Sequence, residues 1–183
     1  MLPTTRLRQA LAFSTLIAAA SQVATAAPAR VGDFALLDSE GEFHQLSRYA
    51  DREAVVLVAF DPSCASMADS LDRFAALEAE WGDRDIAFAV IHSALTEDVD
   101  AARRAKADFS LQLPLMLDDS QLVTKTLGLQ QAGAVSVLDP SRLTASYSGG
   151  LDSVAASLSA QLAGSDSVPA AAVKGCDLSF PRL

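Results

Sequence analysis

The sequence is short of positive charge and of long apolar runs. Its 183 residues include 14 lysines and arginines against 23 aspartates and glutamates, which gives a net charge of −9 at pH 7. Nucleic acids and anionic membranes require clustered positive charge on a protein partner, so this balance argues against both. After the first 26 residues, no segment approaches the roughly 20 consecutive apolar residues that cross a bilayer. The composition is 50% hydrophobic, as in one ordinary globular domain with short additional segments.

The first 26 residues contain the three parts of a cleaved secretory signal. Arg6 and Arg8 provide a positive start, residues 10–20 (ALAFSTLIAAA) form a short apolar stretch, and residues 24–26 form a small-residue cleavage site. We therefore expect a mature chain that begins near Ala27. This chain keeps 12 basic residues and carries a net charge of −11, because the leader holds two of the 14 basic residues and no acidic ones. A periplasmic or secreted location follows, without membrane insertion after cleavage, and there a disulfide can persist.

Cysteine is also scarce, because Cys64 and Cys176 are the only two in the chain. In an exported protein with two cysteines, pairing is the default expectation. Such a disulfide would close a large loop and would stabilise the fold by about 4–5 kcal/mol in the chain-entropy model. Cys176 could then act as a resolving thiol on a flexible tail, or it could form half of a permanent staple. Two unpaired thiols, or pairing with another protein, are the remaining alternatives.

The hydrophobic pattern predicts an α/β fold with an N-terminal β-hairpin and a central mixed sheet flanked by helices. The expected strands are two within 32–46, two buried runs at 54–60 and 86–91, a short strand at 113–117, and a closing hairpin at 134–138 and 144–148. One expected helix follows the strand at 54–60 and ends near residue 81. Three further helices are expected at 96–109, 119–127 and 153–162. Thr96 is expected to cap the second of these helices and Asp118-Asp119 the third. This pattern divides the chain into a signal at 1–26, a domain at 27–164 and an irregular tail at 165–183 that carries Cys176.

Cys64 follows the strand at 54–60 and opens the next helix. In sheets of this kind, reactive groups gather beyond the carboxyl ends of the parallel strands. A thiol at a helix N-terminus is favoured as thiolate by the helix dipole, whereas the nearby Asp61 would raise the thiol pKa. A reactive thiol and a buried structural cysteine therefore both remain open.

Four strings in order carry a resemblance: VVLVAFDPSCASMADSLDRFAALEAEW, DIAFAVIHS, LPLMLDD and TLGLQQAGAVSVLDP. Together they resemble the redoxin branch of the thioredoxin-like superfamily, which includes the alkyl hydroperoxide reductase and thiol-specific antioxidant proteins. The resemblance covers about Val31 to Gly164 and implies a thioredoxin-like fold for the domain at 27–164.

Several positions depart from the family's motifs. Thioredoxins carry Cys-x-x-Cys and copper-chaperone relatives carry Cys-x-x-x-Cys, but here the second cysteine is replaced by Met67 or Ala68. Peroxiredoxins carry Pro-x-x-x-Thr-x-x-Cys, where this chain has Leu57 and Asp61. Most members also place a cis-proline opposite the cysteine, where this chain has Gly133. These departures are compatible with a site that has lost catalysis or has been repurposed.

Other candidate groups give weaker signals. Cys64, Met67 and His92 are soft or borderline ligands compatible with Cu(I). Because Met67 fits an apolar helix face and His92 ends a strand, we expect neither a metal nor an organic cofactor. Gln130 and Gln131 are candidates to touch whatever binds opposite Cys64, although the ordinary polarity of an exposed loop explains them as well.

We therefore expect an exported thioredoxin-like redoxin with thiol-based redox activity, either thiol–disulfide exchange or peroxide reduction. Cys64 would be the attacking thiolate and Cys176 the resolving thiol. The partners would be a thiol, disulfide or peroxide substrate and an external electron donor that the sequence does not identify. The alternative is a non-catalytic binding or structural module in which a Cys64–Cys176 bond serves only as a staple.

Overall fold

The strand β4 (Ala54–Phe60) lies at the centre of a six-stranded sheet, and all of its residues are buried. The fold comes from a computed structural model that describes residues 29–93, 98–165 and 168–180. The expected leader lies outside these ranges. β4 pairs in parallel with β5 (Ile86–His92) and antiparallel with β7 (Val135–Asp139), so both of its edges are hydrogen-bonded. This position explains why its sequence is apolar without interruption.

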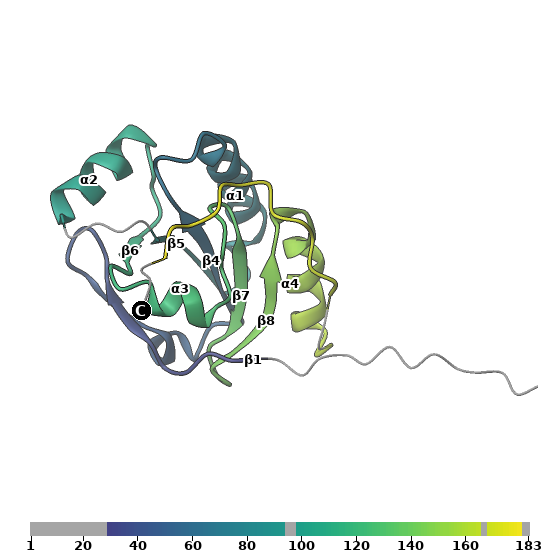
Figure 1. Cartoon of the computed structure of the whole chain (residues 1–183). Helices are drawn as coiled ribbons and strands as arrows, with labels where there is room; N and C mark the ends of the chain where they lie inside the picture. The colour runs from purple at the N-terminus through teal and green to yellow at the C-terminus, as the bar shows by residue number, and fades with distance from the viewer. Residues whose placement is uncertain (1–28, 94–97, 166–167, 181–183) are drawn as a thin grey trace, which may run out of the picture.

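The sheet has the strand order β1-β8-β7-β4-β5-β6 (Figure 1). β6 (Leu115–Leu117) extends the parallel part, whereas β8 (Thr144–Gly149) and β1 (Ala29–Arg30) extend the antiparallel part. A separate two-stranded hairpin consists of β2 (Ala35–Leu37) and β3 (Phe43–Gln45). The predicted central mixed sheet and N-terminal hairpin are therefore confirmed.

Helices flank the sheet in the part of the chain that the structure describes (Figure 1). They are α1 (Met67–Trp81), α2 (Val99–Asp108), α3 (Leu122–Thr126), α4 (Val154–Leu162) and the 3₁₀ turns η1 (Leu46–Tyr49) and η2 (Leu151–Ser153). None of these described helices is long and apolar enough to cross a membrane. After α4 the tail, yellow in Figure 1, passes back across the end of the sheet near α1 and reaches α3.

Two expected helix caps are corrected by the structure. The cap of α2 is Asp98, whose carboxylate accepts a hydrogen bond from the N–H of Asp100, and Thr96 lies outside the described residues. The cap position of α3 is Gln121 rather than Asp118-Asp119. Asp118 nevertheless satisfies the start of α3, because its buried carboxylate accepts from the N–H of Thr124 in the first turn.

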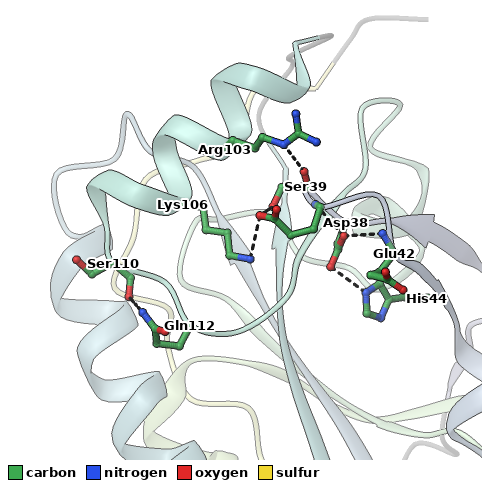
Figure 2. A network of polar contacts seen from close by, with 9 residues as sticks. Asp38, Ser39, Glu42, His44, Arg103, Lys106, Ser110 and Gln112 are labelled. Carbon is green, nitrogen blue, oxygen red and sulfur yellow. Dashed lines mark hydrogen bonds and ion pairs between the residues drawn. The ribbon is translucent and has the colours of Figure 1, made fainter.

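A buried carboxylate, that of Asp38, organises the turn of the N-terminal hairpin (Figure 2). Asp38 Oδ1 accepts from the N–H groups of Glu40 and Glu42, both at 2.9 Å, and Oδ2 lies 3.2 Å from His44 Nε2. Asp38 also forms an isolated bridge with Met116, in the edge strand β6. The carboxylate therefore holds the hairpin turn in the shape that docks on the sheet.

The connection to α2 is made next to this carboxylate. Arg103 donates from Nε to the carbonyl oxygen of Ser39 at 2.7 Å, and Lys106 lies 3.4 Å from a Glu40 oxygen (Figure 2). The hairpin thereby bridges the sheet edge and a helix.

We expect Asp38→Asn to lower the free energy of unfolding by about 1–3 kcal/mol near pH 7, since it weakens hydrogen bonds to a charged group. Burial raises the pKa of Asp38, but the N–H of Glu42, the His44 side chain and the N–H of Glu40 together hold it below its ordinary value. A lowered folded-state pKa gives stability that is complete above the unfolded pKa and is lost as the pH falls through the folded one.

Urea unfolding of the wild-type and D38N chains from pH 7 to pH 3 tests this expectation. The difference between them should shrink toward acid pH, and a pH-independent difference would contradict the assignment. Asp51→Asn, at an exposed position, is the matched control and should show little change.

Candidate active site

Cys64 lies in the turn between β4 and α1, at the end of the sheet where three parallel strands stop level with one another. Phe60 of β4 is in register with His92 of β5, which is in register with Leu117 of β6. The turn is shaped by Asp61, whose carboxylate accepts from Ser63 N at 2.8 Å and Ser63 Oγ at 2.7 Å. The Cys64 side chain is buried, with 4% of its surface exposed.

Cys64 forms a disulfide with Cys176, 112 positions later, with their Cα atoms 5.7 Å apart. The expected pairing is therefore confirmed. The two sulfurs differ in environment, because Cys176 lies on the exposed tail. The N–H of Cys176 lies 3.1 Å from Cys64 Sγ, and Ser66 Oγ lies 3.4 Å from the same sulfur. Two hydrogen-bonding groups thus surround the buried sulfur.

The tail beside the disulfide is bound to the segment before β7 through its backbone. The N–H of Ala132 donates to the carbonyl of Cys176 at 2.9 Å, and the N–H of Leu178 donates to the carbonyl of Gln130 at 2.8 Å. Between them, Gln131 forms an antiparallel bridge with Asp177, and its Nε2 donates to the Asp177 carboxylate at 2.9 Å. Gln130 and Gln131 therefore contact what lies opposite Cys64, and in this structure that is the chain's own tail.

A second anchor holds the tail upstream of the disulfide. The N–H of Gly150 donates to the carbonyl of Ala171 at 2.9 Å, and the N–H of Ala171 lies 3.2 Å from the buried Tyr147 hydroxyl. This hydroxyl donates to the carbonyl of Gly150 at 2.5 Å. A Cβ at Gly150 would overlap the carbonyl oxygen of Ala172, so glycine is required for the close passage of the two backbones.

An ion-pair network lies at the same end of the sheet. Asp152, in η2, pairs with Arg73 of α1 and with Lys174 of the tail. Hydrogen bonds from Arg73 and then from Lys174 lower the pKa of Asp152. The side chains are well exposed, so these ion pairs contribute less to holding the tail than the backbone contacts do.

Gly133 is the residue expected at the cis-proline position of the family, and among the described residues there is no cis peptide bond. Its φ is +82°, in the left-handed region that favours glycine. A Cβ would lie 2.9 Å from Ser70 Oγ in α1. The N–H of Gly133 donates to the carbonyl of Ala59 at 2.8 Å, so glycine lets this segment lie directly against α1 and the end of β4.

A buried polar cluster that was not expected from the sequence lies at the carboxyl ends of β5 and β6. Asp118 Oδ2 accepts from the N–H and the hydroxyl of Thr124, both at 2.7 Å, and this hydroxyl lies 3.0 Å from Ser93 Oγ. Gln121, with a φ of +54°, donates to the carbonyl of Ser93. Ser93 and Asp118 each directly follow a parallel strand, which is the signal that could have revealed the cluster. It fixes the start of α3 and so helps to position the segment that leads to Gln130.

The remaining candidate ligands lie in the core. Met67 is fully buried on the inner face of α1, and His92 is buried with its ring centroid 5.6 Å from that of Phe60. Within the described ranges, no group of three or more His, Cys, Asp or Glu side chains is arranged to hold a metal ion.

Comparison with known proteins agrees with this geometry. Solved structures that resemble the chain show that its fold is thioredoxin-like. A hypothetical protein from Sinorhizobium meliloti 1021 has 20% identity and a TM-score of 0.68, over 85% of this chain and 95% of its own. Peroxidoxin BcpB from Mycobacterium tuberculosis has 18% identity and a TM-score of 0.60, over 75% and 96%. A putative thiol:disulfide interchange protein DsbE from Chlorobium tepidum has 14% identity and a TM-score of 0.63, over 76% and 99%.

The profile of the AhpC/TSA family matches residues 24–145, and the chain belongs to this family. A search of curated proteins gives no match. The family membership and the Cys64–Cys176 disulfide together support a function in thiol redox chemistry.

We expect Gly175→Ala to weaken the disulfide, because a Cβ at this position would overlap the carbonyl oxygen of Ala132. A backbone overlap of this kind costs about 1–3 kcal/mol, which makes the disulfide about 5- to 140-fold easier to reduce. Thiol trapping in graded glutathione mixtures measures the effect. Ser179→Ala, at an exposed position in the same tail, is the control. Equal reduction of the G175A and wild-type chains would show that the tail does not need this close approach.

Proposed function

We propose that the protein is an exported thiol–disulfide oxidoreductase with Cys64 and Cys176 as its redox-active pair. The observation that carries the proposal is the disulfide between a buried sulfur before a helix and an exposed sulfur on an irregular tail. A disulfide that is only structural does not require one of its two sulfurs to be accessible to other molecules. The secretory signal expected at 1–26 would direct the chain to an oxidising compartment, in which a disulfide can persist.

The surroundings of Cys64 suit it as the attacking thiolate. It lies three residues before the first residue of α1, near the positive end of the helix dipole, and Ser66 Oγ is within reach of its sulfur. Asp61, the acid expected to oppose ionisation, is hydrogen-bonded to Ser63. The groups that favour the thiolate thus lie close to the sulfur.

The cycle follows from the two sulfurs. The Cys64 thiolate attacks a substrate disulfide, forms a mixed disulfide and releases the first substrate thiol. The Cys176 thiolate then attacks Cys64 Sγ, restores the internal disulfide and releases the second substrate thiol. An external dithiol returns the pair to the reduced state, and its thiolate would first reach the exposed Cys176 and expel Cys64 as thiolate.

Peroxide reduction is the second candidate, because the AhpC/TSA family and the similarity to a peroxidoxin favour it. In that case Cys64 would become a sulfenic acid, which Cys176 would convert to the same disulfide with loss of water. Consumption of hydrogen peroxide or an alkyl hydroperoxide by the reduced chain separates this candidate from disulfide exchange.

We expect the Cys64–Cys176 pair to equilibrate within the glutathione range, at about −180 to −260 mV. The measurement is thiol trapping of the mature chain in graded glutathione mixtures. After reduction, Cys64 should be alkylated faster than Cys176 at neutral pH, and the Cys64→Ser and Cys176→Ser chains assign the two rates.

A pair that stays oxidised below about −300 mV would instead be structural and would make the chain a binding or structural module. Two thiols that react equally slowly after reduction would also contradict the proposal.

A further inference from the structure

The tail binds to residues 130–132 in the manner of an added strand. Two backbone hydrogen bonds, from Ala132 to Cys176 and from Leu178 to Gln130, flank an antiparallel bridge. Main-chain bonding of this kind binds an extended segment with little dependence on its sequence, while pockets beside it give specificity. The residues that touch the tail's side chains therefore indicate which sequences fit.

Three positions of the tail meet specific constraints. The position before the cysteine must be glycine, because a Cβ at Gly175 would overlap the carbonyl oxygen of Ala132. The position after it carries a hydrogen-bond acceptor for Gln131, which Asp177 provides at 2.9 Å. The second position after it is apolar and buried, since Leu178 is only 7% exposed.

The surface along residues 130–132 that the tail covers is here called the groove. We propose that the groove recognises an extended Gly-Cys-Asp-Leu-like segment of a partner protein, and that the tail is its internal occupant. The inference rests on the proposed function, because the partner's cysteine would meet Cys64 where Cys176 now does. It adds the sequence class of the substrate and a role for the tail as a competitor.

The surface beside the tail has room for such a partner. Two open hollows of about 500 and 410 Å³ lie against Gly128 and Gln130, and Asp177 lines both. Lys125 and Phe180 line the larger hollow, and Gln131 and Val173 line the smaller one. These hollows flank the tail, so they would accept larger side chains of a partner at positions outside its Gly-Cys-Asp-Leu segment.

The tail can leave once the disulfide is open. Beyond the second anchor, non-covalent contacts hold it: the backbone bonds to 130–132, the Gln131–Asp177 and Ser66–Lys174 hydrogen bonds, the packing of Leu178 and exposed ion pairs. Lys174 and Asp152 have 74% and 48% of their side-chain surface exposed, and exposed pairs contribute little. The disulfide is the one covalent contact, so its reduction lets the tail exchange with a partner segment.

The full-length Cys176→Ser chain tests the inference with a synthetic peptide. The probe is VKGCDLSF, the sequence of residues 173–180, with its cysteine joined to 2-nitro-5-thiobenzoate. The Cys64 thiolate attacks the peptide sulfur, forms the Cys64–peptide disulfide and expels the coloured thiolate, so one S–S bond forms as one breaks. The absorbance of the released thiolate gives the rate.

Matched peptides test each recognition feature. Replacing the peptide's glycine by alanine should slow the reaction by at least about tenfold, and replacing its aspartate by alanine by about fivefold, the equivalent of one hydrogen bond. Adding Gln131→Ala to the protein should abolish the difference in rate between the aspartate peptide and its alanine variant. The C176S chain keeps its own tail, which competes equally with every peptide, so the ratios report on the groove alone.

The mixed disulfide of glutathione with the same thiobenzoate measures the reactivity of Cys64 without the groove. Equal rates for all peptides, with a fast glutathione probe, would overturn the inference and leave the proposed function intact. No reaction with any probe would overturn both. Re-oxidation of the wild-type chain mainly to a disulfide-linked dimer would assign the groove to a second copy and would also overturn the inference.

Discussion

The Cys64–Cys176 disulfide joins two segments of very different character, and the candidate site depends on this one covalent contact. Cys64 belongs to the rigid part of the fold, between a fully buried strand and a helix whose inner face is packed. Cys176 belongs to a segment without regular secondary structure. In the chain-entropy model a loop of this length gives about 4–5 kcal/mol, which is a large share of the stability of an ordinary domain. The covalent bond therefore adds to the backbone contacts that order this segment.

The arrangement also requires that backbone segments pass very close to one another at two places. Gly150 lets the tail pass the end of β8, and Gly133 lets the segment before β7 lie against α1. Nothing in the family's cysteine motifs provides these contacts, because the partner of Cys64 comes from outside the conventional motif. The missing local cysteine at Met67 and the distant Cys176 can thus be understood together: the second thiol is provided by the tail, and α1 keeps a buried methionine in its core-facing position.

Most of the fold was predictable, because it depends on local periodicity. The apolar runs at β4 and β5 and the core-facing residues of α1 follow directly from the spacing of apolar residues. The position of Cys64 was also predictable, because it lies between a strand and a helix that both have a clear pattern of apolar residues. The path of the tail did not, because irregular backbone that bonds to a distant segment leaves no periodic signal. The burial of Asp118 was not predictable for a related reason: a carboxylate after a strand has the same local sequence pattern whether it satisfies the next helix from the surface or from within the core.

The anchor at Ala171 limits how far the released thiol can travel. Cys176 lies five positions after Ala171, so with this anchor in place the thiol remains within about 18 Å of it even when the segment is fully extended. Cys176 can then move only within the reach of the short segment that follows Ala171, unlike a residue at a free chain terminus. It stays at a high local concentration over Cys64 and cannot reach disulfides elsewhere on a bound partner. A covalent complex at Cys64 would therefore be short-lived, with its lifetime set by the length of this segment.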